Sequence, residues 1–423
     1  MSTPAMSSSS SPAASPRLSF SALGPGIMVA AAAIGGSHLV ASTQAGAVYG
    51  WQLVGLIILV NFFKYPFFQF GARYSAATGE SLLAGYARLG KPWLVLFLVL
   101  NVFAGVVNIA ALLGLTGALA TFIVPGVTPP VLAGVAAVIS LMIVLRGHYR
   151  MVDVVSKWIV LLLAVVTVLA TLLAFSQPAA AAPGFVAPTP WTLASLGVLI
   201  SLMGWMPAPV EVSAMNSVWS RNKFMNRGRP DMRVALFDLN VGFIGTALLA
   251  LFFVALGARI LHGSGVELAT SGAAFSRQLA DMYGAVIGDW SRWLVITAAL
   301  CCIYSSTLTC IDGYNRVNKS AIDNLRGEDN PDTESPLLVL LVTSGALGLV
   351  LMFPGTMLAM LKFAMIAAFL TTPVFALMNY RLIRASHIPD EHRIGKVLNI
   401  WSQAGLAFLF GFSFLFIWWQ WLM

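Results

Sequence analysis

Charged residues are scarce in this chain of 423 residues. Asp, Glu, Lys and Arg together make up only 9% of it, whereas hydrophobic residues make up 58%, and the mean hydropathy is +0.85. This composition excludes a soluble domain and predicts a polytopic integral membrane protein, which has the lipid bilayer as its partner. The net charge of +8 does not indicate a nucleic-acid partner, because the basic residues fit the cytoplasmic loops of a membrane protein.

Cysteine is also scarce, and its three copies lie in one apolar segment as Cys301, Cys302 and Cys310. They do not resemble a disulfide framework, and we expect them to be small buried side chains. The chain has no phosphate-binding loop, no HExxH motif and no CxxC pair, and its five histidines are scattered. These absences argue against an enzyme, and we expect neither a cofactor nor an obligate protein partner.

Acidic residues are missing from residues 1–19, which are rich in Ser, Pro and Ala and contain one Arg. This composition predicts a disordered tail. An organellar transit peptide is the weaker alternative, because such peptides carry several Arg. We expect residues 20–423 to form one transmembrane domain in the bacterial inner membrane.

Long apolar runs, in contrast, are abundant. A helix needs about 20 apolar residues to cross a bilayer, and the sequence holds eleven such runs. Residues 259–290 are the longest connection between runs and leave room for a short helix. The runs cover roughly residues 24–49, 51–72, 93–123, 130–146, 153–176, 191–219, 234–258, 291–315, 336–353, 357–380 and 399–422.

The distribution of Lys and Arg predicts the orientation of these runs. With the N-terminus inside the cell, 19 of the 24 basic residues lie in inner segments, and only Arg259, Arg277 and Arg292 lie in outer segments. Lys64 and Lys362 fall within the apolar runs themselves. We therefore expect a cytoplasmic N-terminus and a C-terminus outside.

Two of the runs are interrupted in the middle. Gly35-Gly36-Ser37-His38 divides the first run, and adjacent glycines form helix poorly. Met206-Pro207-Ala208-Pro209 divides the sixth run, where two prolines remove two backbone donors. We predict unwound backbone at 35–38 and 206–209. Because these runs occupy matching places in two five-span halves, the pair points to a transporter with inverted repeats and a site near the midplane; packing kinks are the alternative.

Several stretches resemble the Nramp family of divalent-metal transporters. The first run, with Ile34-Gly35-Gly36-Ser37-His38 and Gln44-Ala45-Gly46-Ala47, is similar to the first span of that family. Met206-Pro207 is similar to its sixth-span Met-Pro-His, and Ser305-Ser306-Thr307-Leu308-Thr309 to part of its eighth span. The resemblance covers the chain from about residue 20. It implies an all-α polytopic membrane protein with the leucine-transporter-type fold: two inverted five-helix repeats, about 24–176 and 191–380, plus an extra helix at 399–422.

The chain departs from this family where the family binds its metal. The Asp and Asn of the family's Asp-Pro-Gly-Asn motif fall on Gly35 and His38, and the His of its Met-Pro-His falls on Ala208. The family's Met is retained as Met206, and Met203 falls where the family offers a backbone carbonyl. These replacements place the chain on a divergent branch.

The resemblance also implies a change in proton coupling. The family's third-span acids, which are linked to proton movement, fall on Asn101, Asn108 and Ala111. Asn and Ala carry no titratable proton. We therefore expect weak or no proton coupling, with His38 or Glu211 as the remaining carriers.

Four residues are candidates for metal or substrate binding: Gly35, His38, Met203 and Met206. His38 could ligate a metal or relay a proton; alternatively, it bonds to backbone freed by the break. Met203 and Met206 share a helix face and offer thioether ligands; the alternative is packing. We predict that these four residues line a polar cavity, with His38 and Met206 as metal ligands.

Three charged residues are candidates for coupling or charge pairing: Glu211, Lys64 and Asp312. A carboxylate at membrane depth is costly unless it is paired or hydrated, which makes Glu211 a functional candidate; alternatively, it caps the second half-helix. Lys64 needs a counter-charge, which Glu211, Asp238 or Asp312 could supply. The alternative for Asp312 and Asp238 is pairing with loop Arg or Lys.

The sequence thus predicts a secondary transporter that moves a metal cation, such as manganese, iron or magnesium, by alternating access. A transporter of a different solute, an organic cation or amino acid, is the alternative, because the Asp is missing and Lys64 would repel a divalent ion. A membrane sensor that transports nothing is a third hypothesis.

Overall fold

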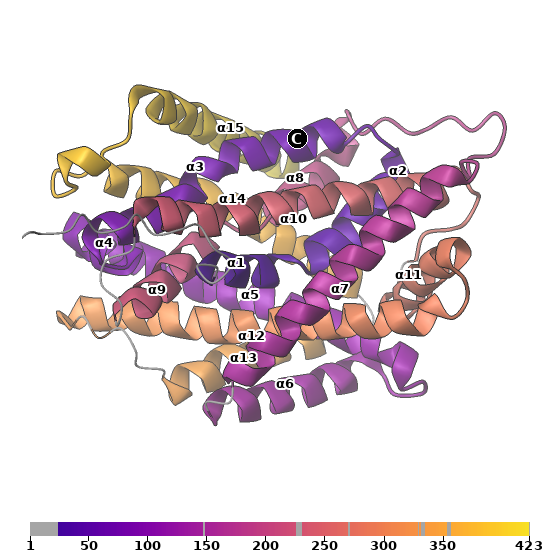
Figure 1. Cartoon of the computed structure of the whole chain (residues 1–423), viewed down its shortest axis with the longest axis horizontal. Helices are drawn as coiled ribbons and strands as arrows, with labels where there is room; N and C mark the ends of the chain where they lie inside the picture. Colours follow the sequence, from indigo (N-terminus) through magenta and orange to yellow (C-terminus); the bar gives the residue numbers. More distant parts are fainter. Residues whose placement is uncertain are drawn as a thin grey trace, which may run out of the picture.

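The computed structural model describes residues 24–146, 149–225, 231–269, 271–328, 330, 335–352 and 357–422. The predicted disordered tail, residues 1–19, lies outside this part of the chain. Every regular element within it is helical (Figure 1), so the all-α prediction is confirmed. Seven of the described helices are long and apolar enough to cross a membrane, and a bent pair of helices provides an eighth crossing. The chain is therefore an integral membrane protein.

Each of the eleven predicted runs corresponds to one helix or to one broken pair of helices. Two further helices, α4 and α11, lie between runs. The elements are α1 (Pro25–Ala33), the π-helical turn η2 (Ser37–Ser42), α2 (Thr43–Tyr49), α3 (Val54–Thr78), α4 (Leu82–Leu89), α5 (Lys91–Ile123), α6 (Pro129–Leu145), α7 (Tyr149–Ser176), α8 (Leu196–Gly204), α9 (Val212–Met225), α10 (Met232–Ile260), α11 (Gly272–Ile287), α12 (Ser291–Arg326), α13 (Pro336–Met352), α14 (Met357–Ile383) and α15 (Lys396–Leu422).

Most of the long helices run roughly along the long axis of the molecule, whereas α7 is inclined to it (Figure 1). In that view α15 lies along the upper edge, and α6 and α13 lie along the lower edge. The two short helices lie at opposite ends of the bundle, α4 at the left and α11 at the right. Helix α11 occupies the connection 259–290, where the sequence left room for a short helix, whereas α4 was not predicted.

The packing of the helices reflects two repeats of opposite orientation. The first span, α1 and α2, packs against the seventh, α10, and the sixth span, through α9, packs against the second, α3. The third and eighth spans, α5 and α12, pack against each other. This exchange of partners between the two halves is what inverted repeats predict, and α15 is the extra helix.

Small residues bring the first and seventh spans unusually close. A Cβ atom added to Gly46 would lie 2.1 Å from the carbonyl oxygen of Val254, and one added to Gly257 would lie 2.3 Å from that of Thr43. Only glycine allows backbones to approach this closely, which is the usual way for helices to associate in a membrane. The second half of the first span, α2, is thereby fixed against α10.

Both predicted breaks are present, with shifted limits. Helix α1 ends at Ala33, and after Gly35 and Gly36 the chain continues at Ser37 at an angle of 50° to α1. Ser37 and His38, which we predicted to be unwound, already belong to the π-helical turn. The carbonyl oxygen of Gly35 accepts the amides of His38 and Leu39 just before that turn. In the sixth span, residues 205–211 separate α8 from α9, and they include the predicted segment 206–209.

Candidate functional site

A small cavity lies between the two breaks. Its lining includes Gly35 and Gly36 from the first break and Ala208 and Pro209 from the second. Helices α5 and α12 complete the lining with Asn108, Tyr314 and other residues. The volume is about 30 Å³, and a water molecule needs roughly 10–15 Å³. The cavity therefore has room for a species of the size of water or a bare ion.

A buried polar network adjoins this cavity. The side-chain amide of Asn108 accepts a hydrogen bond from Trp205 Nε1 (3.0 Å) and donates to Tyr314 Oη (2.6 Å). Tyr314 Oη donates in turn to Glu211 Oε1 (3.1 Å), which also accepts a longer bond from Asn108 (3.4 Å). The network joins α5 and α12 to the second break, and three of its four members line the cavity.

Glu211 is the carboxylate of this network, and it is only partly satisfied. Its side chain is 1% exposed. Oε1 accepts two hydrogen bonds, but Oε2 accepts none from the described residues. A buried carboxylate oxygen without a donor is costly. A cation or a bound water beside Glu211 would satisfy it.

Lys64 lies on the other side of the second break. It projects from α3 and is fully buried. Its Nζ donates hydrogen bonds to the carbonyl oxygens of Met203 (2.6 Å), Gly204 (2.8 Å) and Ala208 (3.3 Å). Glu211, one of the carboxylates that we considered as its counter-charge, lies near enough for the two charges to interact. The described hydrogen-bond acceptors of Nζ are backbone carbonyls, two of them in the last turn of α8, where the helix dipole is negative.

The two aspartates that we considered as partners of Lys64 act elsewhere. The Asp238 carboxylate accepts the amide N–H groups of Gly24 and Gly26, both at 2.8 Å, and so caps the start of α1. Asp312 forms an ion pair with Arg316 one turn further along α12, at 2.8 Å. For Asp312 the structure therefore supports the alternative of pairing with a basic residue.

His38 does not line the cavity between the breaks. Its ring is fully buried against α10: Nδ1 lies 2.8 Å from Ser37 Oγ, and Nε2 lies 2.9 Å from the carbonyl oxygen of Thr246. These contacts match the alternative in which the histidine bonds to backbone. To ligate a metal, His38 would have to give up one of these two bonds.

The two methionines are fully buried, and neither is part of the cavity lining. Met203 contributes its carbonyl oxygen to Lys64. Trp205, which lies between the methionines in sequence, lines the cavity instead. Of the four residues predicted to line it, only Gly35 does so. Sequence reasoning missed Trp205 and Tyr314, although a hydrogen-bonding aromatic residue beside a broken helix is a usable signal.

A larger vestibule lies above the small cavity, on the face that we expect to be outside. Its volume is about 440 Å³, and its polar lining comes from Gln44, Ser201 and Lys362, among others. Leu361 also lines it. A Cβ atom added to Gly36 would lie 2.9 Å from both Leu361 and Trp205, so both side chains lie against the first break. Because Leu361 lines the vestibule and Trp205 lines the cavity, we infer that these two side chains separate the two spaces.

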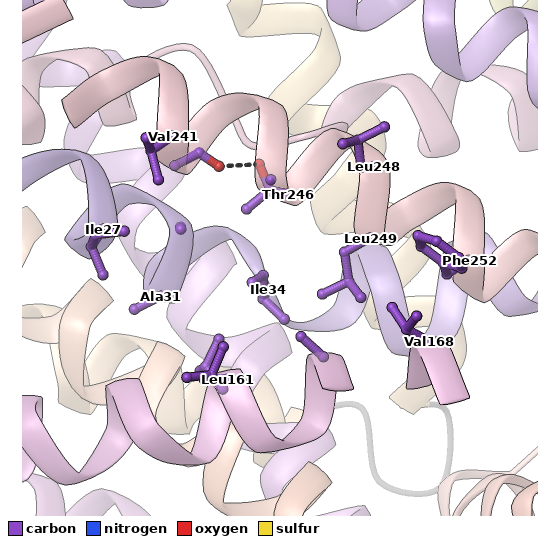
Figure 2. A pocket seen from close by; sticks show the side chains of 15 residues that line it. Ile27, Ala31, Ile34, Leu161, Val168, Val241, Thr246, Leu248, Leu249 and Phe252 are labelled. Atoms are coloured by element: carbon purple, nitrogen blue, oxygen red, sulfur yellow. Dashed lines mark hydrogen bonds between the residues drawn. The ribbon is translucent and has the colours of Figure 1, made fainter. Parts of the chain in front are cut away.

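The space on another side of α1 has a different character. Figure 2 shows a cavity of about 310 Å³ between α1, α7 and α10, surrounded by Ile34, Leu161, Leu249 and other apolar side chains. The hydroxyl of Thr246, a polar group in its lining, donates back to the carbonyl oxygen of Gly242 (3.0 Å). This cavity offers a polar solute almost no partner, so we assign the functional site to the opposite side of α1.

No cluster of three or more His, Cys, Asp or Glu side chains that could hold a metal ion occurs among the described residues. A cation between the breaks would therefore rely on the Glu211 carboxylate and on neutral oxygen atoms.

We next compared the chain with known proteins. Residues 26–419 match the family described as natural resistance-associated macrophage protein-like. An uncharacterized protein of Pasteurella multocida is 44% identical over 405 residues, which are 94% of this chain and 92% of that protein.

Solved structures confirm the fold. A manganese transporter of Eremococcus coleocola, solved with an aromatic bis-isothiourea compound, is 13% identical with a TM-score of 0.68, covering 92% of this chain and 84% of that one. Mhp1, a nucleobase-cation-symport-1 family transporter, is 14% identical with a TM-score of 0.58, covering 93% and 89%. The family match extends over almost the whole chain, and the protein belongs to the natural resistance-associated macrophage protein-like family.

Proposed function

We propose that the protein is a secondary transporter that moves a metal cation through the cavity between the two breaks. The observation that carries this proposal is the cavity itself, about 30 Å³ in volume and adjoined by the partly satisfied carboxylate of Glu211. The family match over residues 26–419 supports transport, as does the manganese transporter with the same fold.

The size of the cavity favours an ion over an organic solute. Sites for drug-sized molecules typically measure about 300–1,000 Å³, roughly tenfold more than the space between the breaks. Lys64 was one reason to consider an organic solute, because an ammonium repels a divalent ion. Here its ammonium faces the carbonyl oxygens at the end of α8, which offset part of its charge.

The donors near the cavity favour a hard divalent ion. The Glu211 carboxylate and the Tyr314 hydroxyl present oxygen, and the Asn108 carbonyl oxygen, which accepts from Trp205, has a second lone pair. Oxygen ligands suit Mg²⁺ and Mn²⁺. With so few protein ligands, the ion would keep part of its water shell, which Mg²⁺ does readily.

Coupling to protons is weak or absent in this proposal. Asn101 bonds to Asn318 (2.7 Å) and Asn108 bonds within the cavity network, and amides do not titrate. Both ring nitrogens of His38 are engaged. The membrane potential alone supplies about 2.3 kcal/mol per charge per 100 mV, which is sufficient to drive a cation inward.

Uptake into proteoliposomes tests the cargo. We expect Mn²⁺ or Mg²⁺ to enter when an inside-negative potential is imposed, and we expect the Glu211→Gln variant to slow uptake by about tenfold or more, because a charge-assisted contact is worth roughly 1.5–3 kcal/mol. Glu80→Gln, at the end of the bundle, is the matched control and should transport normally. Absence of metal uptake, or uptake that an excess of amino acids or organic cations abolishes, would contradict the proposal.

A pH-sensitive dye inside the same vesicles tests the coupling. Metal entry should leave the internal pH nearly unchanged. Acidification that depends on metal and that persists in both His38→Ala and Glu211→Gln would reveal a separate proton path and disprove the coupling hypothesis.

A further inference from the structure

The end of helix α8 has the features of a cation-binding site. The last carbonyl groups of a helix have no partner within the helix, and they carry the negative end of its dipole. Here the carbonyl oxygens of Met203 and Gly204 belong to the last turn of α8, and that of Ala208 lies across the break. Three oxygen atoms from both sides of the break thus converge on one point.

That point holds the Nζ atom of Lys64. The distances to the three oxygens are 2.6, 2.8 and 3.3 Å, and the two shortest are as short as charge-assisted bonds or slightly shorter. An ammonium has three N–H donors and no acceptor, so it satisfies all three carbonyls at once. A neutral amine would present its lone pair to one of them. The geometry therefore favours the charged form.

We propose that the end of α8 is a cation-binding site that the chain fills with its own ammonium group. This tethered cation, carried by α3, joins the two halves of the sixth span and fixes the width of the break. If Lys64 were shortened, the vacated site would take a small monovalent cation with N–H donors, such as ammonium or a primary alkylammonium. The inference does not depend on which ion is transported, because it concerns the geometry of the break.

Chemical rescue tests this inference. Lys64→Ala removes the ammonium and three methylene groups, and propylammonium supplies the same atoms. We expect Lys64→Ala to reduce uptake in proteoliposomes by at least about tenfold. It removes the described donor to the buried carbonyls of Gly204 and Ala208, and among the described residues it leaves the Met203 carbonyl only backbone N–H donors, such as Met206 at 3.4 Å. Propylammonium should restore a substantial part of the activity and should raise the melting temperature of the purified variant. Tetramethylammonium, which has no N–H donor, should do neither.

Two further variants separate charge from packing. Lys64→Met fills the same space without a charge, so it should be as inactive as Lys64→Ala but should not respond to propylammonium. Lys362→Ala removes an exposed lysine of the vestibule and should show no response to propylammonium. The inference is wrong if Lys64→Met transports like the wild type, or if alkylammonium ions affect neither the activity nor the melting temperature of Lys64→Ala.

A measurement on the unmodified protein covers the case in which the variants do not fold. Nitrogen NMR of protein labelled in its lysine side chains should show one ammonium whose protons exchange slowly with water, because Lys64 is fully buried. A buried lysine signal with the shift of a neutral amine would overturn the inference.

Discussion

The two broken spans are held in their bent shapes by different kinds of interaction. The break in the sixth span, 205–211, receives the ammonium of Lys64 on its carbonyl oxygens and contains the carboxylate of Glu211. At the first break, the described side chains that contact the backbone carbonyls carry no charge. Ser306 Oγ lies 2.7 Å from the carbonyl oxygen of Ala31 and 3.0 Å from that of Ile34, and Cys302 Sγ also donates to Ile34.

This difference indicates which break is the more rigid. Hydrogen bonds to a charged group contribute about 1.5–3 kcal/mol each, whereas neutral ones contribute about 0.5–1.5 kcal/mol. The first half of the first span, α1, is also short, and its end is joined to the rest of the span by a 50° bend. We therefore infer that the sixth-span break is the fixed wall of the cavity and that the first-span break is the part able to move.

The largest effect on stability is expected at the sixth-span break, which we infer to be the fixed wall of the cavity. A Cβ atom added to Gly204, at the end of α8, would lie 1.8 Å from the backbone carbonyl oxygen of Met365, and backbone cannot rotate away as a side chain can. Gly204→Ala should lower the free energy of unfolding by about 3 kcal/mol or more, measured by denaturation in detergent. Gly197→Ala on the same helix, where the added atom meets neighbours at 3.7 Å, is the control and should be tolerated. Equal behaviour of the two variants would contradict the prediction.

A smaller effect is expected at the uncharged break. Ser306→Ala removes a hydroxyl that contacts two carbonyl oxygens of the first span and should cost about 1–2 kcal/mol of stability. Ser402→Ala is the matched control, because the hydroxyl of Ser402 donates to Leu398 on its own helix. We expect this variant to lose less stability than Ser306→Ala. A loss at Ser306 as large as that of Lys64→Met would show that the two breaks are equally rigid.

Gly35 should tolerate a methyl group where Gly204 does not. An added Cβ atom there would meet its neighbours at 3.6 Å, an ordinary contact distance. Gly35→Ala should therefore change stability by less than about 1 kcal/mol. Because Gly35 lines the cavity, the same variant should slow metal uptake. Normal uptake by Gly35→Ala would place the ion elsewhere.

The smallest expected effect comes from His387, a titratable residue outside the spans. It shows how little a partly exposed charge contributes to stability compared with the buried contacts at the breaks. His387 lies 3.1 Å from Tyr74 Oη, and partial burial followed by the nearby Arg88 lowers the pKa of its imidazole. The native state then binds fewer protons than the unfolded state, so stability falls slightly as the pH drops below about 6.5. Between about pH 7 and 5, the melting temperature of His387→Asn should depend less on pH than that of the wild type. An unchanged slope would refute this.

The fold was predictable because the relevant signals are local in the sequence. Apolar runs give the spans, and the glycine pair and the two prolines give the breaks. The short helix α4 escaped prediction because its eight residues are too few for a clear apolar run, although Ser81 caps it by accepting a bond from the amide of Ala84.

The site was less predictable, because it depends on which way side chains turn. His38 follows the first break directly, yet its ring lies against α10, since the carbonyl oxygen of Thr246 offers it a partner there. Lys64 was expected to need a carboxylate; Glu211 supplies a nearby opposite charge, but the hydrogen bonds of the ammonium go to carbonyls at the end of a half-helix. Neither outcome is encoded in spacing along the chain, since each partner lies more than 130 residues away.

The contact of Trp205 and Leu361 at Gly36 has a kinetic consequence. One layer of side chains separates the vestibule from the small cavity. Side-chain rotamers change within picoseconds to nanoseconds when they are free to do so, whereas helices shift within microseconds to milliseconds. An ion could thus exchange with the vestibule many times during one helix movement. Binding at that face would then be close to equilibrium, and the net rate of transport would be set by the slower opening of the opposite side.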